Sequence, residues 1–458
     1  MGAEWSATTI GSLLEDDGGE IKTGPFGTKL KASEYSDMGV PVVSVGEVQL
    51  GRIVLHDKTP KVGTDITDRM PEYVLREGDI VFGRKGAVER SARVVQKQDG
   101  WFLGSDGIRL RLPRFYNTKF IAYQFLTEAH KQWMIQHAAG TTMASLNEGI
   151  IRRIPIVLAP RSEQDAIAHI LGTLDDKIEL NRQMNTTLEA MAQALFKSWF
   201  VDFDPVIDNA LSAGNPIPEP LQARAEIRKA LGEQRKPLPA EIQRQFPSRF
   251  VFTEEMGWVP EGWGISCVGD EFDVTMGQSP PGDTYNEAGE GMPFFQGRAD
   301  FGFRYPSNRV YCTAPTRMAS RGDTLVSVRA PVGDVNMAAE DCCIGRGVSA
   351  SRHKSGSTSF TYYAMLQLHE YFKVYEGEGT VFGSINQKDF KALPQLKIDE
   401  MVVRSFELHA GRFDGKIELA SKEIEDLTKI RDILLPKLIS GQLRIPDAEA
   451  MIEQAAAG

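Results

Sequence analysis

Apolar residues recur at alternating steps of four and three in two stretches of the chain, which is typical of helices that pack along a narrow seam. Each pattern persists for about 30 residues, which corresponds to a helix roughly 45 Å long. A helix of that length is a spacer. Because neither helix can bury its stripe alone, we expect the two to pair as an antiparallel coiled coil. The seam residues are Ile167, Leu171, Leu174, Ile178, Leu188 and Leu195 in the first stretch and Phe406, Phe413, Ile417, Ile424, Leu427 and Leu434 in the second.

Polar residues and a proline modify this pattern. Asn181 and Asn185 fill central steps of the first seam. Buried amides at such positions often fix the register or the partner of a coiled coil, but the same residues also suit a splayed part of the pair that faces solvent, and the pattern leaves both interpretations open. Proline removes a backbone donor and clashes with the preceding turn, so we expect Pro436 to end or kink the second helix near Leu435.

The two stretches belong to an internal repeat with a spacing of 239 residues, and such repeats reveal architecture that single motifs cannot. Residues 140–147 align without gaps with residues 379–386, and the same offset carries Pro155 onto Pro394. A gene duplication without functional meaning would explain the likeness. The halves, however, keep their helices while their N-terminal parts diverge, as expected of two readers of different targets on one scaffold. The offset also carries Lys177-Ile178-Glu179-Leu180 onto Lys416-Ile417-Glu418-Leu419, and Gly78–Phe82 more loosely resembles Gly322–Val326.

The region before each helix contains short β-like runs separated by turns of Gly, Asp and Pro, with one helix-like tract, Phe120–Gln136 or Phe360–Val374. We therefore expect an α+β fold with two α/β domains related by the repeat and separated by the two long helices. The expected boundaries are 1–160 for the first domain, 161–201 for the first helical spacer, 202–255 for a linker, 256–398 for the second domain, 399–440 for the second helical spacer and 441–458 for a C-terminal tail.

The repeated octapeptides favour a structural role. Asn147 is suited to cap a helix that starts at Glu148, and Asn386 followed by Asp389 has the spacing of a capping box. Ser, Thr and Asn commonly serve caps and turns. We expect each motif to close its domain against the long helix, with a ligand role as the alternative.

Charge is distributed unevenly along the chain. The formal net charge of -10 argues against uniform coating of nucleic acid. Residues 20–120 nevertheless contain 17 basic and 13 acidic side chains, and residues 296–354 contain 9 basic and 5 acidic ones. No apolar run approaches the length of a membrane span, and the first residues lack the pattern of a signal peptide, so we expect a cytoplasmic protein.

Motifs for catalysis are missing from the sequence. A methyltransferase acting on a DNA amino group would need an Asn/Asp-Pro-Pro-aromatic tetrapeptide, and residues 279–282 lack both its ends. Residues 24–29 fall short of the spacing of a phosphate-binding loop and suit a turn. The 4 Cys and 7 His show neither metal-ligand spacing nor a triad-like context. We predict no catalytic residue and no metal site.

Taken together, the sequence resembles the specificity subunits of type I restriction-modification systems, over essentially the whole chain. The likeness is carried by the two copies of G-T-x-x-x-S-[LI]-N, by Ile154-Pro155-Ile156, by Glu163–Ala168 leading into Leu174–Ile178, and by Ile433–Gly441. The second copy departs from the pattern with Val402-Val403 in place of Glu163-Gln164.

The resemblance implies a non-catalytic subunit that recognises double-stranded DNA. Each domain would be a target recognition domain for one half of a bipartite site. The paired helices would set the unread spacer and dock two modification (methyltransferase) subunits, and restriction (motor) subunits would join through these. No cofactor is expected on this chain, because S-adenosylmethionine, ATP and Mg would belong to the partner subunits. The alternative is a coiled-coil interaction scaffold whose two domains bind proteins rather than DNA.

Direct readout of DNA needs Arg, Lys, Asn or Gln on loops that face the major groove, with other basic groups on phosphates. Any one such residue is also consistent with an ordinary surface charge. The candidates for DNA binding are Lys29, Lys31, Arg84, Lys85, Arg90 and Arg93 in the first domain and Gln296, Arg298, Arg304, Arg309, Arg317, Arg329 and Arg346 in the second.

Overall fold

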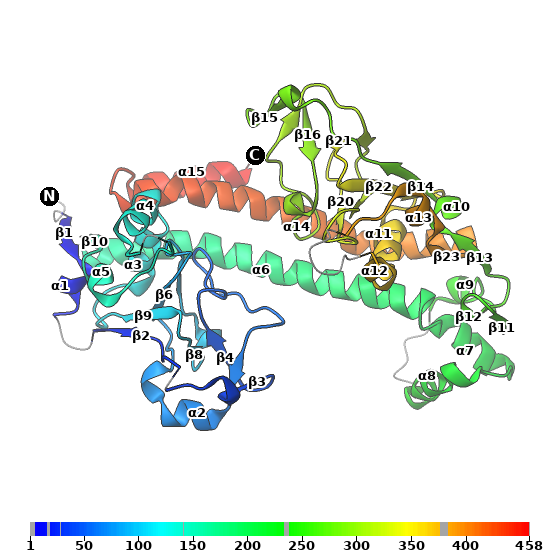
Figure 1. The fold of residues 1–458 in the computed structure, drawn as a ribbon, viewed down its shortest axis with the longest axis horizontal. Helices are drawn as coiled ribbons and strands as arrows, with labels where there is room; N and C mark the ends of the chain where they lie inside the picture. Colours follow the sequence, from blue (N-terminus) through cyan, green and yellow to red (C-terminus); the bar gives the residue numbers. More distant parts are fainter. Residues whose placement is uncertain are drawn as a thin grey trace. The chain divides into compact units, whose positions relative to one another are not determined.

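The computed structural model describes residues 5–15, 19–27, 29–140, 142–232, 238–375 and 383–457 (Figure 1). These form two compact units. Unit 1 comprises Met1–Arg182 together with Lys422–Gly458, and unit 2 comprises Gln183–Ser421. Thr141 and Gly379–Phe382 of the repeated motif lie outside the described residues. The domain boundaries expected from the sequence stay predictions.

Two helices of 40 residues each connect the units: α6 (Arg161–Phe200) and α14 (Glu400–Ile439). Their limits differ by the same 239 residues as the repeat. In unit 1 the first half of α6 contacts the second half of α14, where Asp175 lies 2.9 Å from Arg431. In unit 2 the second half of α6 contacts the first half of α14, where the rings of Phe196 and Phe406 lie 5.5 Å apart. The expected antiparallel helix pair is confirmed.

The last turn of α14 differs from the expectation. The helix continues through Pro436 to Ile439 instead of ending near Leu435. Proline leaves the helix without one backbone hydrogen bond. Leu434, Leu435 and Leu438 are buried in the core of unit 1, however. Their burial offsets the missing bond, because each buried leucine side chain contributes about 1.5–3 kcal/mol.

The two asparagines of the seam are buried and bonded across the helix pair. Asn181 and Asn185 are each 2% exposed. The Asn181 side-chain amide donates to the Glu423 carboxylate at 2.7 Å, and that of Asn185 donates to the Ser421 hydroxyl at 3.1 Å. The interpretation that they face solvent is therefore wrong, and their cross-helix bonds favour a role in fixing the register.

Replacement of both asparagines by leucine is expected to keep or raise the free energy of unfolding while loosening the register. The Oδ1 atom of Asn185 is buried without a hydrogen-bond partner in the described chain, so an apolar side chain removes an unsatisfied group. Urea unfolding and sedimentation velocity would measure stability and oligomeric state. A variant whose oligomeric state is unchanged would contradict the register role, whatever its stability.

The first domain is built on two four-stranded sheets in unit 1. One is antiparallel with the order β2-β9-β6-β7, and the other has the order β3-β5-β4-β8 with β4 and β8 parallel. The strands are β1 (Ser6–Thr9), β2 (Glu20–Thr23), β3 (Tyr35–Ser36), β4 (Val40–Val43), β5 (Lys61–Val62), β6 (Ile80–Gly83), β7 (Ser91–Arg93), β8 (Phe102–Leu103), β9 (Gly107–Arg111) and β10 (Pro155–Leu158). The helices are α1 (Ile10–Leu13), α2 (Thr64–Arg69), α3 (Thr118–Phe125), α4 (Glu128–His137), α5 (Glu148–Arg152) and α15 (Ile445–Ala457).

Unit 2 repeats this frame. Its antiparallel sheet β14-β22-β19-β20 corresponds to β2-β9-β6-β7, and its second sheet has the order β15-β17-β16-β21-β18. The strands are β11 (Phe250–Thr253), β12 (Gly257–Pro260), β13 (Gly264–Cys267), β14 (Phe272–Met276), β15 (Tyr285–Asn286), β16 (Met292–Phe295), β17 (Tyr311–Cys312), β18 (Met318–Ala319), β19 (Thr324–Ser327), β20 (Val335–Met337), β21 (Cys342–Ile344), β22 (Val348–His353) and β23 (Pro394–Lys397). The helices are α7 (Asp204–Ala213), α8 (Glu219–Ala230), α9 (Ala240–Gln243), α10 (Val268–Glu271), α11 (Thr358–Gln367), α12 (His369–Lys373) and α13 (Gln387–Ala392).

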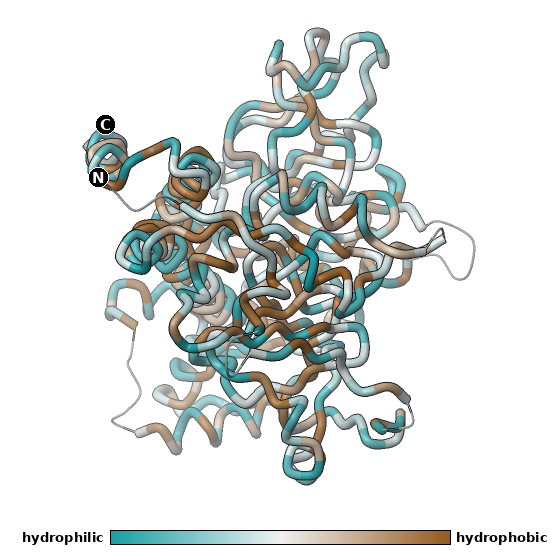
Figure 2. Tube along the Cα trace, turned by 90° about the vertical axis from the view of Figure 1, so that its left-hand side faces the viewer, coloured by the Kyte–Doolittle hydropathy of each residue, from teal (hydrophilic) through white to brown (hydrophobic). Residues whose placement is uncertain are grey.

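Two local features differ from the sequence pattern. Each helix-like tract is split in two, and in the first the Thr127 hydroxyl caps α4 by accepting the His130 backbone N–H. The linker is also folded. Arg224 of α8 pairs with Asp204 of α7 at 2.6 Å, and Val206, Ile207 and Phe246 are buried. Hydrophobic (brown) and hydrophilic (teal) stretches alternate along the described part of the chain (Figure 2).

A half-buried histidine, His130, and a buried one, His353, predict a loss of stability in mild acid. Burial lowers the pKa of His130 in unit 1 and of His353 in unit 2. The unfolded chain, with histidine pKa values near 6.5, then binds more protons as the pH falls. Their contribution to stability is present above about pH 6.5 and is lost below it. Urea unfolding between pH 8 and pH 5 should show this slope, and the pair of changes His130→Gln and His353→Gln should flatten it.

Candidate nucleic-acid interface

Four loops of the first domain meet at the ends of β2, β4, β6 and β9. We call residues 24–26, 44, 84–86 and 104–106 loop cluster 1. The Gly24 amide donates to the Gly107 carbonyl at 3.0 Å, and the Gly104 amide donates to that of Val43 at 2.7 Å. The Arg84 amide donates to the Asp106 carbonyl at 2.9 Å. These bonds hold segments from across the domain beside one another.

The second domain has the same arrangement in residues 277–279, 296, 328–330 and 345–347, which we call loop cluster 2. The Gly277 amide donates to the Val348 carbonyl at 2.9 Å, and the Gly345 amide donates to that of Phe295 at 2.8 Å. The Val328 amide donates to the Gly347 carbonyl at 2.9 Å. Each bond corresponds to one in loop cluster 1, so the two clusters share one backbone framework.

Glycine pairs make this framework possible. A Cβ atom on Gly24 would overlap the carbonyl oxygen of Gly104, and one on Gly277 would overlap that of Gly345. Only glycine permits such a close approach of two backbones. The same requirement at corresponding places in both domains supports their equivalence.

The repeated octapeptide fixes one loop of each cluster. In unit 1 the Leu146 amide donates to the Arg84 carbonyl at 2.8 Å, and Ser145 forms a β-bridge with Lys85. In unit 2 the Ile385 amide donates to the Val328 carbonyl at 3.0 Å, and Ser384 forms a β-bridge with Arg329. The motif therefore attaches the loop after β6 or β19 to the rest of its domain.

The asparagine that ends each motif is a helix cap, as expected. The Asn147 side chain accepts the Ile150 backbone N–H, and that of Asn386 accepts the Asp389 backbone N–H, both at 3.0 Å. An accepting side chain at this position satisfies one of the free donors of the first turn. The motif thus links its loop cluster to α5 or α13, the last helix before the long one.

Loop cluster 1 presents an aromatic ring and two cations. Phe26 is 52% exposed, and the Arg84 guanidinium lies 4.5 Å from the centre of its ring. Arg84 also donates to the Ser105 carbonyl at 3.2 Å. The Lys85 ammonium lies 3.4 Å from the Asp106 carboxylate. A guanidinium held on a ring retains a fixed plane of donors, which suits the recognition of base edges.

Loop cluster 2 presents different side chains on the same framework. Gln278, Gln296, Arg329 and Arg346 are exposed, and the Ser279 hydroxyl accepts the Arg346 backbone N–H at 3.4 Å. Beside the cluster is a cavity of about 340 Å³ lined by residues 274–278 together with Arg317 and Gln387. Glutamine and arginine are side chains that form paired hydrogen bonds with adenine and guanine edges.

Five of the DNA-binding candidates lie in one or the other loop cluster. These are Arg84 and Lys85 in loop cluster 1, and Gln296, Arg329 and Arg346 in loop cluster 2. Arg317 borders the cavity beside the second cluster. Several of the others have local partners. Lys29 donates to the Tyr73 hydroxyl at 3.2 Å, which raises the pKa of Lys29. The remaining surface candidates are Lys31 beside Glu34, Arg90 with Glu89, Arg93 with Glu77 and Thr118, Arg298 with Asp334, and Arg309 with Asp300.

Arg304 does not belong to a surface that DNA reaches. Its side chain has no exposed area and forms ion pairs with Glu189 of α6 and Asp414 of α14. The guanidinium also lies 3.9 Å from the centre of the Tyr362 ring. Arg304 therefore attaches the second domain to both long helices, and we remove it from the DNA-binding candidates.

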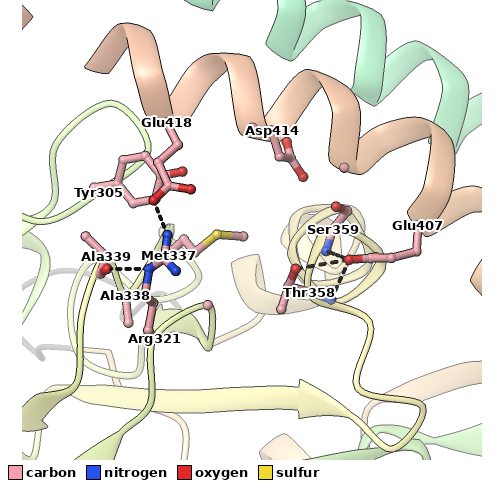
Figure 3. Close-up of a pocket in the computed structure, with 13 residues that line it drawn as sticks. Tyr305, Arg321, Met337, Ala338, Ala339, Thr358, Ser359, Glu407, Asp414 and Glu418 are labelled. Carbon is pink, nitrogen blue, oxygen red and sulfur yellow. Dashed lines mark hydrogen bonds and ion pairs between the residues drawn. The ribbon is translucent and has the colours of Figure 1, made fainter. Parts of the chain in front are cut away.

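A second cavity, of about 360 Å³, lies in unit 2 between the second domain and α14 (Figure 3). The carboxylate of Glu407 accepts the backbone N–H groups of Thr358 at 3.0 Å and Ser359 at 3.2 Å, which caps α11. Arg321 pairs with Glu418 on another side. Glu407 thus binds the first turn of α11 and Arg321 binds Glu418, and both interactions indicate a structural role for the cavity.

The sequence patterns missed Phe26, Ser105, Asp106, Gln278 and Ser279, which share the loop clusters with the candidates. Gly24 and Gly277 precede the missed residues of the first loop in each domain, but they do not share the 239-residue offset, so the repeat could not have identified them. Within the described ranges, no three His, Cys, Asp or Glu side chains gather as a metal site would need. Nor does any helix in those ranges combine the length and apolar character that a membrane crossing needs.

Comparisons with known proteins agree on one family. Residues 8–190 match the model of the type I restriction modification DNA specificity domain. The putative type I restriction enzyme MjaX specificity subunit of Methanocaldococcus jannaschii is 28% identical over 455 residues, which cover 96% of this chain and 94% of the relative. The HindI specificity subunit of Haemophilus influenzae is 28% identical over 367 residues, 72% of this chain and 78% of the relative. In fold, the chain resembles the S subunit of the type I system from M. genitalium, with a TM-score of 0.53 at 17% identity over 95% of this chain and 96% of that one.

Proposed function

Because this chain belongs to the specificity subunits of type I restriction-modification systems, we propose that it recognises a bipartite double-stranded DNA target with one half-site per domain. A specificity subunit has a non-catalytic role in such a system. The observation that carries the proposal is the presence of two loop clusters on one backbone framework with different side chains. Equivalent scaffolds with different contact groups suit two sequences read on the same kind of duplex.

Docking of two modification subunits is the second part of the proposal. The Lys-Ile-Glu-Leu repeat supports it. Ile178 and Ile417 are buried in the helix seam, whereas Leu180 and Leu419 of the same tetrapeptides are 59% and 72% exposed. An exposed leucine at the same place in both copies would offer each of two identical partners the same contact. The restriction subunits would join through the modification subunits, and these partner subunits together would carry S-adenosylmethionine, ATP and Mg.

The proposal is tested by co-expression of the chain with its modification subunit, followed by mapping of methylated adenines in the host DNA. We expect two short motifs separated by a spacer of fixed length. A contiguous motif would contradict the bipartite model. A complex that forms without any methylated motif would favour the interaction scaffold.

Docking is tested in the same system with Leu180→Glu and Leu419→Glu. We expect each single change to weaken co-purification of one modification subunit, and the double change to abolish it, because a charge replaces an apolar contact. A matched control is Leu408→Glu on α14, where the leucine is 70% exposed but lies outside the tetrapeptide. Equal effects of all three single changes would contradict a specific role of the repeat.

A further inference from the structure

The shared hydrogen bonds align the two loop clusters residue by residue. Arg84 corresponds to Val328. The Arg84 amide donates to the Asp106 carbonyl as the Val328 amide donates to that of Gly347. The carbonyls of Arg84 and Val328 in turn accept the amides of Leu146 and Ile385 of the repeated motif. Lys85 then corresponds to Arg329, since each forms the β-bridge with the motif serine. By the same bonds, Ser105 corresponds to Arg346, Asp106 to Gly347, Phe26 to Ser279, and Ser44 to Gln296.

One position in this alignment carries a cation in both domains. Lys85 and Arg329 are both exposed, and both follow directly on a residue whose backbone the motif holds. Apart from the two conserved glycine pairs, Gly24 with Gly277 and Gly104 with Gly345, the chemistry changes at the other aligned positions, as in the replacement of Ser105 by Arg346 or of Asp106 by Gly347. The repeat has therefore kept charge at one place and varied the groups around it.

Two domains that read different half-sites still meet the same sugar-phosphate backbone. A contact that both domains need in the same form is a contact with phosphate, whereas contacts with base edges must differ. We propose that Lys85 and Arg329 are equivalent phosphate contacts that set the position of each half-site, and that the divergent residues around them read the bases. This division of labour rests on the proposed DNA recognition.

The surroundings of the two cations predict unequal effects. Lys85 is already paired with Asp106 at 3.4 Å, so binding to phosphate replaces an existing interaction. Arg329 forms no ion pair with any residue in the described part of the chain, and glycine stands at the position of Asp106. Removal of Arg329 should therefore weaken DNA binding more than removal of Lys85.

The test measures DNA binding by the complex of the full chain with its modification subunit over a range of salt concentrations. The probes are the mapped target duplex and duplexes with one base pair changed in either half-site. For Arg329→Ala we expect the slope of log affinity against log salt to fall in magnitude by about 0.9. The loss of affinity relative to the unmodified complex should therefore be roughly eightfold larger at ~0.1 M salt than at ~1 M salt. The preference for the target over each changed duplex should stay the same.

Matched variants separate the two roles. Arg329→Lys should restore the slope, because it retains the charge. Arg346→Ala removes another exposed arginine from the same cluster and should reduce the preference at one base pair of the second half-site. The inference is overturned if Arg329→Ala leaves affinity unchanged or selectively relaxes one base pair. A complex that never distinguishes the target from the changed duplexes would instead overturn the proposed function.

Discussion

Replacement of Arg304 by methionine is expected to lower the free energy of unfolding of unit 2 by about 3–5 kcal/mol, the usual cost of breaking a buried ion pair from one side. Methionine fills a similar volume but leaves Glu189 and Asp414 without their cation. Both carboxylates are only 12% exposed. The change also removes the donor to the Tyr363 hydroxyl at 2.7 Å. The expected loss therefore reflects uncompensated charge more than lost packing.

Arg321→Met provides the matched control for Arg304→Met. Arg321 pairs with Glu418 on the same helix α14, but its side chain is 63% exposed and that of Glu418 is 47% exposed. Exposed pairs contribute about 0–1 kcal/mol. Guanidinium unfolding followed by tyrosine and tryptophan fluorescence would compare the variants. Equal unfolding midpoints for the two would show that the Arg304 pairs do not hold the second domain.

Trp199→Ala is expected to lower the free energy of unfolding of unit 2 by about 3–5 kcal/mol, as is usual when a large buried aromatic is removed. Trp199 lies near the end of α6 and is 1% exposed. Its ring centre lies 5.2 Å from that of Phe246 in the folded linker and 5.9 Å from that of Phe406 in α14. The change leaves a cavity where three segments of unit 2 meet.

Near-ultraviolet circular dichroism during urea unfolding would measure the loss in Trp199→Ala. Leu408→Ala on α14 is a suitable control, because Leu408 is 70% exposed and such surface changes usually alter stability by less than about 0.5 kcal/mol. If the unfolding midpoint of Trp199→Ala equals that of the control, the packing of Trp199 against Phe246 and Phe406 does not stabilise unit 2.

Features that depend on local pattern were predictable from the sequence. The seam of α6 and α14, their shared offset and their pairing follow from apolar spacing alone, and the caps at Asn147 and Asn386 follow from the preference of asparagine for that position. The fold class follows because the repeat places strand-like runs before each helix. In each of these cases the pattern that predicts an element lies within a few turns of chain, and the repeat of that pattern then indicates which two helices pair.

Features that depend on distant residues were not predictable. Arg304 resembles any surface arginine in sequence, and its burial is decided by Glu189 and Asp414, which lie more than 100 residues to either side. The linker combines prolines with a charged helical segment, a pattern that does not predict packing against the rest of unit 2. Pro205 and Pro220, however, occupy first-turn positions of α7 and α8, where proline costs no hydrogen bond. The loop clusters likewise depend on backbone contacts between separate segments.

The division of the chain between the two units affects the order in which they fold during synthesis. Unit 2 is one continuous segment, Gln183–Ser421, whereas unit 1 needs both ends of the chain. The core of unit 1 includes Leu434 and Leu438 of α14 and Ala448 beyond it. A ribosome makes these residues after those of unit 2, so the second domain has all its segments available while the first still lacks part of its core. The domain that is translated first is therefore completed after the second domain, and the apolar face of the first half of α6 stays without its partner until the second half of α14 has been made.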